Sequence, residues 1–382
     1  MKRKRLFFKI PFLILLLALT GVSCSRLTKV KDLVTQPTAR EKYQRDFEKN
    51  SPLLSRWEEE SEKALLDSVL ITLPYSEAGY FSPRTYPVYS YDITLDQGER
   101  LQVKTVTDSS HILVFLDLFQ QKKTDSTSEY ELIKSAEYES VGFQEEISEA
   151  GIYKLLIQPE IEADTPFSIE IYKEPTYLFP VVSAGNSAIQ SYWGADRDAG
   201  RRSHEGIDIF ASRGTPVIAV TAGRVSSTAN KGLGGKQVWL RDSKRGHSLY
   251  YAHLDSIIAV RGMRVFPGDT LGLVGNTGNA RTTAPHLHFG IYNGYRGARN
   301  PLPFVFQIQK PESIAALEVL KSDILISSVA ANMRKGPSTA SQIGGKTKPK
   351  DTLKLLGRTS GWYHVRQNEE NFFIHQSLAS PL

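Results

Sequence analysis

The sequence has almost no cysteine: Cys24 is the single one among 382 residues. One thiol cannot form a disulfide within the chain. Long apolar runs are also scarce, and the run from Ile10 to Leu19 is too short for a comfortable membrane-spanning helix. No DNA- or RNA-binding motif is found, so nucleic acid is not an expected partner.

The first residues are typical of a secretory signal. Basic residues come first, the apolar run follows, and small residues then lead to Cys24. Gly21-Val22-Ser23-Cys24 resembles the lipobox of bacterial lipoproteins, although leucine is commonest where Gly21 stands. The resemblance implies a signal peptide over 1–23 and a lipid anchor at Cys24. Plain secretion is the alternative. Ser25, in place of an aspartate, favours the outer membrane or a periplasm-facing location.

Histidine is scarce as well, yet four of the eight histidines gather in three segments together with one aspartate. Two imidazoles and a carboxylate are a usual set of ligands for a catalytic Zn²⁺ that keeps one position open for water. Two imidazoles would remain for proton transfer. Convergence of the segments would therefore predict a metal-dependent hydrolase. The residues concerned are His204, Asp208, His253, His286 and His288.

Strand geometry makes this convergence plausible. Residues 206–210 alternate polar and apolar side chains and read as a half-buried strand. His204 and Asp208 then point the same way, with Gly206 leaving room for an ion. His286 and His288 likewise share one side of their strand. The other four histidines are interpreted as surface or hydrogen-bonded structural residues: His111, His247, His364 and His375.

The chain resembles a family over about 181–305. The similar family is that of LytM/lysostaphin-type zinc endopeptidases, which cut peptide cross-links in peptidoglycan. Beyond the metal motifs, the resemblance includes Arg197 ahead of the first histidine. The chain departs from the family after Phe289, where an acidic residue is common and this sequence has Gly290. Its other segments are Tyr192-Trp193-Gly194, Gly214-Thr215-Pro216, Ala222-Gly223, Gly234-Gly235, Pro267-Gly268-Asp269 and Gly275-Asn276-Thr277-Gly278.

The resemblance implies a role for each site residue. His204, Asp208 and His288 would be the zinc ligands, with water in the fourth place. His253 and His286 would take a proton from that water and stabilise the oxyanion, in an order that spacing leaves open. Some relatives have lost ligands and only activate other wall enzymes, so a catalytically idle wall-binding module is the alternative.

Two further hypotheses concern regulation and partners. Asp196 or Asp198 precedes the first ligand and would autoinhibit the site by filling the open position. Charge also divides the chain, because residues 24–180 carry 17 basic and 28 acidic residues, whereas residues 181–382 carry 25 and 13. A basic half attracts polyanions, which outside the cytoplasm include peptidoglycan peptides. An activator protein is a possible partner that the sequence does not identify.

The overall prediction is a mainly β, multidomain protein. A tether and a helical segment occupy 24–69, with Ser51 as N-cap and Pro52 at the first helical position. Short strands predict a β-sandwich over 70–175. They are expected at Tyr91–Leu95, Leu101–Val106, Ile112–Leu118, Gly151–Ile157 and Phe167–Tyr172.

The C-terminal half is expected to contain two further domains. A β-roll peptidase domain over 181–305 would be followed by a short helical linker over 306–321. Residues 322–382 resemble a bacterial SH3-like β-barrel, a module that usually binds the wall. Within it, Trp362 is expected in the core and the position of Tyr363 is left open.

Overall fold

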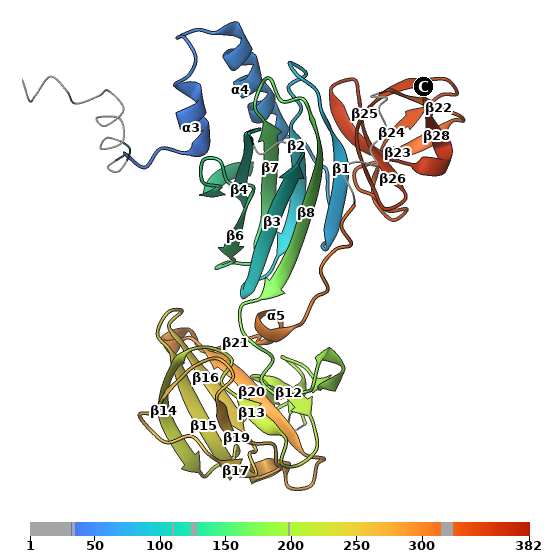
Figure 1. The fold of residues 1–382 in the computed structure, drawn as a ribbon. Helices are drawn as coiled ribbons and strands as arrows, with labels where there is room; N and C mark the ends of the chain where they lie inside the picture. The colour runs from blue at the N-terminus through green and yellow to red at the C-terminus, as the bar shows by residue number, and fades with distance from the viewer. Residues whose placement is uncertain (1–31, 33–34, 109–110, 124–127, 198, 315–323) are drawn as a thin grey trace, which may run out of the picture.

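The computed structural model describes residues 32, 35–108, 111–123, 128–197, 199–314 and 324–382. The predicted signal peptide, the anchor at Cys24 and Asp198 lie outside these ranges. The architecture is mainly β with few helices, as the sequence predicts (Figure 1). Among the helices described, none combines the length and the apolar character needed to cross a membrane.

Two sheets pack face to face over 70–175 and form the sandwich domain. All five predicted strands are present, with slightly different ends, whereas β1, β5 and β6 were not predicted. Alternating buried side chains of the facing strands make one apolar core between the sheets. The first sheet has the order β2 (Tyr89–Leu95), β7 (Gly151–Pro159), β4 (Val114–Lys123), β5 (Ser128–Ser135). The second contains β1 (Tyr75–Phe81), β8 (Thr165–Pro175), β3 (Glu99–Thr107) and β6 (Gly142–Glu146).

The C-terminal domain continues the second sheet of the sandwich domain. Strand β25 pairs with β1, and Gly79 lies opposite Gly357, where a Cβ on Gly79 would stand 2.4 Å from the Leu356 carbonyl oxygen. The result is a single 11-stranded sheet through both domains. The strands of the C-terminal domain are β22 (Ile324–Ser327), β23 (Ala331–Arg334), β24 (Ile343–Thr347), β25 (Thr352–Thr359), β26 (Trp362–Gln367), β27 (Glu370–His375) and β28 (Ala379–Pro381).

Side chains of the C-terminal domain also enter the core of the sandwich domain. Trp362 is buried there, so its predicted core position is confirmed, while Tyr363 packs against the smaller core of the C-terminal domain. At the junction, the fully buried Glu77 accepts a hydrogen bond from the Tyr91 hydroxyl at 2.7 Å. The Nδ1 atom of His364 lies 2.9 Å from the same carboxylate. His364 is thus a buried, hydrogen-bonded structural residue.

The predicted helical segment forms two helices, α3 (Ala39–Gln44) and α4 (Pro52–Leu65). Ser51 is the N-cap residue and Pro52 occupies the first turn, as predicted, although the Ser51 side chain makes no capping hydrogen bond. The buried Trp57 indole donates to the Pro159 carbonyl at 2.9 Å, which fixes α4 against the sandwich domain. These helices therefore serve packing.

Residues 177–305 form a second body, the roll domain, with a large sheet, a three-stranded sheet and a shared apolar core. Its single described α-helix is α5 (Leu302–Val305). The large sheet has the order β18 (Arg264–Val265), β14 (Gly223–Asn230), β15 (Lys236–Asp242), β16 (His247–Ala252), β20 (His286–Tyr292), β12 (Ile207–Phe210), β9 (Ile189–Ser191), with β21 (Ala298–Arg299) beside β20. The small sheet contains β13 (Pro216–Ile218), β19 (Thr270–Leu273) and β17 (Ser256–Ile257), and β10 (Asp196–Arg197) pairs with β11 (Arg202–Ser203).

The helical linker predicted over 306–321 is wrong in its first part. Residues 306–314 contain no helix, and 315–323 lie outside the described residues. The sequence 306–314 contains Pro311, whose fixed φ and missing N–H disfavour a helix interior.

Charged side chains join the roll domain to the end of the sandwich domain. Glu146 of β6 accepts hydrogen bonds from Arg100 (2.9 Å), Lys244 (3.2 Å) and Arg245 (2.8 Å). Helix α5 contacts β8 at the same end (Figure 1). The acidic and basic halves of the chain therefore meet in a defined ion-pair network.

This network predicts an acid-sensitive domain contact. Burial raises the pKa of Glu146, but hydrogen bonds from Arg245, Arg100 and Lys244 outweigh it and lower the pKa to about 2. The stabilisation is therefore complete above the ordinary pKa of 4.5 and is lost as the pH falls toward 2. Glu146→Gln should lower the thermal midpoint by about 2 °C at pH 7, and the difference should shrink below pH 4.5. Glu145→Gln, next to it, is the control; an unchanged midpoint for Glu146→Gln would contradict the prediction.

Candidate metal centre

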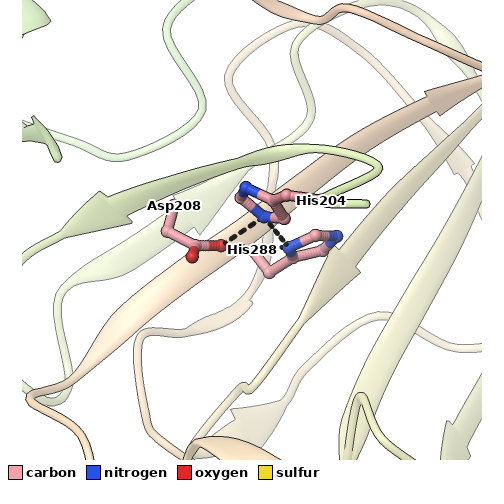
Figure 2. Close-up of side chains that lie close together, drawn as sticks. All are labelled: His204, Asp208 and His288. Atoms are coloured by element: carbon pink, nitrogen blue, oxygen red, sulfur yellow. Dashed lines mark hydrogen bonds and ion pairs between the residues drawn. The ribbon is translucent and has the colours of Figure 1, made fainter. Parts of the chain in front are cut away.

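Three buried or half-buried donor atoms converge on one point of the large sheet (Figure 2). The Nε2 atom of His204 lies 3.0 Å from Asp208 Oδ1 and 3.0 Å from His288 Nδ1, and those two atoms are also 3.0 Å apart. Asp208 on β12 and His288 on β20 are direct partners in the antiparallel register. His204 comes from the segment that leads into β12.

This triangle fits a tetrahedral metal ion. Four ligands at the usual zinc distances would stand about 3.3 Å apart, close to the observed 3.0 Å separations. Two imidazoles and one carboxylate are also the chemistry of an open zinc site. Within the described part of the chain, these three are the only group of at least three histidine, cysteine or acidic residues with this geometry.

Gly206 lies against one of the three donor groups. A Cβ at this position would stand 2.6 Å from Cε1 and 2.8 Å from Nε2 of His288. The missing side chain therefore makes room for the imidazole of His288. Any larger residue would displace one of the three donor groups.

The outer atoms of the donor groups are held by neighbours. Arg197 Nη2 donates to Asp208 Oδ2 at 2.7 Å and to Ser191 Oγ at 2.7 Å. His204 Nδ1 lies 2.9 Å from the Tyr192 carbonyl oxygen, so it carries the proton and leaves Nε2 free to bind a metal. Burial would raise the pKa of Asp208, but the close imidazoles of His204 and His288 outweigh it and hold the pKa well below its usual range.

Arg197 is one of the residues on which the family resemblance rests, but the sequence did not predict its contact with Asp208. Because it fixes the carboxylate that points into the site, Arg197→Ala should weaken zinc binding by about 10- to 100-fold. Competition with a chromophoric chelator measures this affinity. Arg213→Ala, which removes an exposed arginine paired with Asp255, should bind zinc like the wild type. Equal affinities for the two variants would contradict the prediction.

His253 and His286 lie beside this triangle, with ring centroids 5.0 Å apart. His253 has a φ of 63°, a left-handed conformation that few non-glycine residues adopt and that often occurs at functional sites. Its Nδ1 lies 2.9 Å from the Thr277 carbonyl, and Nδ1 of His286 lies 2.9 Å from the Ala284 carbonyl. Each ring therefore keeps its Nε2 free for chemistry.

Electrostatics keep one of these imidazoles neutral. Burial first, and then the neighbouring His286 and His288, lower the pKa of His253 to about 4. A neutral imidazole at pH 7 has a lone pair that can accept a proton. Phe210 stacks on the ring of His286 at 4.9 Å and fixes its orientation.

All five residues line one open cavity of about 730 Å³. Arg202, Glu205, Tyr250 and Tyr292 contribute to its walls. Asp196 does not line the cavity and its side chain is exposed on β10, so it does not fill the fourth position. Asp198 lies outside the described residues.

Comparison with known proteins identifies the domain that carries this site. Residues 202–301 match peptidase family M23. The chain carries a peptidase family M23 domain. Residues 328–373, within the C-terminal domain, match the bacterial SH3 domain family. The homologues of the M23 domain are endopeptidases of the LytM/lysostaphin type.

The similarity to curated M23 relatives is limited to this domain. The L-Ala–D-Glu endopeptidase of Bacillus subtilis is 36% identical over 124 residues, 30% of this chain and 38% of the relative. Lysostaphin of Staphylococcus simulans is 36% identical over 107 residues, 27% of this chain and 21% of the relative. The solved catalytic domain of S. simulans lysostaphin is 34% identical, with 30% of this chain and 87% of that chain covered and a TM-score of 0.27. The matched region thus spans less than half the length of these curated relatives.

Proposed function

We propose that this protein is a zinc-dependent endopeptidase that hydrolyses peptide cross-links of peptidoglycan. The observation that carries the proposal is the triangle of His204, Asp208 and His288 at the wall of an open cavity. The M23 domain supports a cell-wall hydrolase as the function class. The two unliganded histidines beside the triangle favour catalysis over an idle wall-binding module.

Each side chain would contribute a separate part of the chemistry. His204, Asp208 and His288 would hold the metal, and a bound Zn²⁺ supplies a water of lowered pKa and polarises the scissile carbonyl. One of His253 and His286 would take the proton of the attacking water. The other, when it carries a proton on Nε2 as well as on Nδ1, would donate a hydrogen bond to the oxyanion. Both rings are held through Nδ1, so each would act through Nε2.

The rest of the chain would bring this site to the wall. We propose export directed by residues 1–23 and a lipid anchor at Cys24, with the C-terminal domain binding wall peptides. The sequence pattern of the first 24 residues supports the anchor. Metabolic labelling with a fatty acid tests it, and the Cys24→Ala variant should take up no label.

Digestion of purified peptidoglycan by the zinc-loaded protein tests the activity. Mass spectrometry of the products should show new amino and carboxyl termini within the peptides, and the bond cleaved would be read from their masses. The relatives are named for different bonds, including L-Ala–D-Glu and glycyl-glycine, so the bond in this case comes from the experiment. An unchanged product profile, together with stimulation of an added amidase, would favour the idle module instead.

A further inference from the structure

Three aromatic rings stand together on the face of the large sheet that carries the metal centre. They are Trp239 on β15, Tyr250 on β16 and Tyr292 on β20, and we name them the aromatic cluster. Trp239 and Tyr250 are cross-strand partners with ring centroids 4.4 Å apart. The ring of Tyr292 lies 5.2 Å from Trp239 and 6.3 Å from Tyr250.

The aromatic cluster is not part of the hydrophobic core. Its members alternate along their strands with fully buried residues such as Leu240, Tyr251 and Ile291, which point to the other side of the sheet. The three rings themselves are half-buried and belong to none of the core clusters. Tyr250 and Tyr292 line the cavity, and Trp239 packs beside them. Half-exposed rings at a cavity are typical of a ligand-binding surface.

The aromatic cluster continues the metal site. Tyr250 and Tyr292 line the cavity, and the Tyr250 ring lies 5.8 Å from the ring of His288. Gly290 lies between His288 and Tyr292 on β20 and is the direct partner of Tyr250 on β16. A Cβ there would stand 3.0 Å from the ring of Tyr292 and 3.1 Å from the Glu205 carbonyl oxygen. The absence of a side chain therefore lets the Tyr292 ring lie close to the strand.

Polar groups border the rings. The Tyr250 hydroxyl donates to Gln237 Oε1, which leaves the amide NH₂ of Gln237 as a donor. The Tyr292 hydroxyl donates to Glu205 Oε2 at 3.4 Å, and Glu205 is exposed at the cavity wall. The surface thus combines apolar ring faces with an amide donor and a carboxylate acceptor.

We propose that the aromatic cluster binds a hexopyranose ring of the glycan strand next to the peptide being cut. A pyranose presents an apolar C–H face that packs on aromatic rings, and its hydroxyl groups bond to amides and carboxylates. A peptide built from small and charged residues has no group that covers three rings. This inference rests on the proposed function, because it places the glycan beside the hydrolysed bond.

Two substrates test the proposal: a cross-linked peptide dimer that carries its disaccharides, and the same dimer without sugars. In the wild type, kcat/KM should be about tenfold higher for the sugar-bearing dimer, the value of one good aromatic contact. Trp239→Leu keeps an apolar side chain but removes the ring. The ratio of kcat/KM for the sugar-bearing dimer to kcat/KM for the sugar-free dimer should then fall close to one, mainly through a change in KM. Phe266→Leu removes an exposed aromatic elsewhere in the domain and should keep the wild-type ratio.

A binding measurement separates this proposal from the proposed function. Calorimetric titration of the full zinc-loaded chain with the peptide-free disaccharide should give binding that Trp239→Leu weakens about tenfold. Disaccharide binding without hydrolysis of either dimer would support the sugar subsite and refute the proposed endopeptidase activity. Hydrolysis with equal kcat/KM for both dimers and no disaccharide binding would overturn the sugar subsite and assign the rings to the peptide.

Discussion

Replacing His288 with alanine is expected to abolish both zinc binding and peptidoglycan hydrolysis. The substitution removes one of the three donor atoms that stand 3.0 Å apart. His204 and Asp208 would then supply only two protein ligands, whereas a catalytic zinc usually has three. Activity should fall on the order of 10⁴-fold, as for other members of an interdependent catalytic group. Zinc content after dialysis and the release of new peptide termini measure the two effects.

The control for this substitution is another histidine of the same chain. His375 is exposed in the C-terminal domain, where its side chain contacts Ser377 and the Trp362 ring. His375→Ala should keep one zinc per chain and the wild-type rate. Retention of zinc and activity by His288→Ala would show that the metal lies elsewhere and would refute the proposed ligand set.

Replacing His253 with alanine should separate zinc binding from catalysis. His253 lies outside the triangle, so the variant should bind zinc as the wild type does. Because a general acid or base contributes about 10²- to 10⁴-fold, hydrolysis should fall by that factor. The loss should appear in kcat more than in KM, since the imidazole acts on the reacting water and not on the substrate as a whole.

The same assays decide this second prediction. Loss of zinc from the His253→Ala protein would instead assign a ligand or structural role to His253. Full activity in the variant would leave His286 as the sole proton-transfer residue. The fold of the variant is checked by its thermal midpoint, because the left-handed backbone at residue 253 is strained for alanine as well.

Much of the site follows from the sequence because strand alternation is a local property. It places His286 and His288 on one side of a strand without knowledge of the fold. The direct pairing of Asp208 with His288 depends on register across 80 residues, which spacing does not determine. The family resemblance supplied that step. The contact of Arg197 with Asp208 depends on the hairpin of β10 and β11, for which the short segment gives no strong pattern.

The unpredicted strand β1 shows where sequence patterns fail. Its residues include Glu77, Ala78 and Gly79, which have weak strand propensity. The strand forms because β8 pairs with one edge along its whole length and β25 pairs with the other edge at Ala78 and Gly79. Tertiary contacts therefore override local preference. The position of Trp362 in the core of the sandwich domain depends on the same pairing. The sequence around Trp362 predicts that it is buried, but not which domain it packs against.

The pairing of β1 with β25 also determines how the proposed wall binding should be tested. Deletion of the C-terminal domain would leave β1 with unpaired N–H and C=O groups along one edge, a template for aggregation with other chains. It would also remove His364, the hydrogen-bond partner of Glu77, and expose this buried carboxylate. A truncated protein would then lose solubility for reasons unrelated to the wall. Substitutions on the exposed side of the C-terminal domain keep the edge covered and report on binding alone.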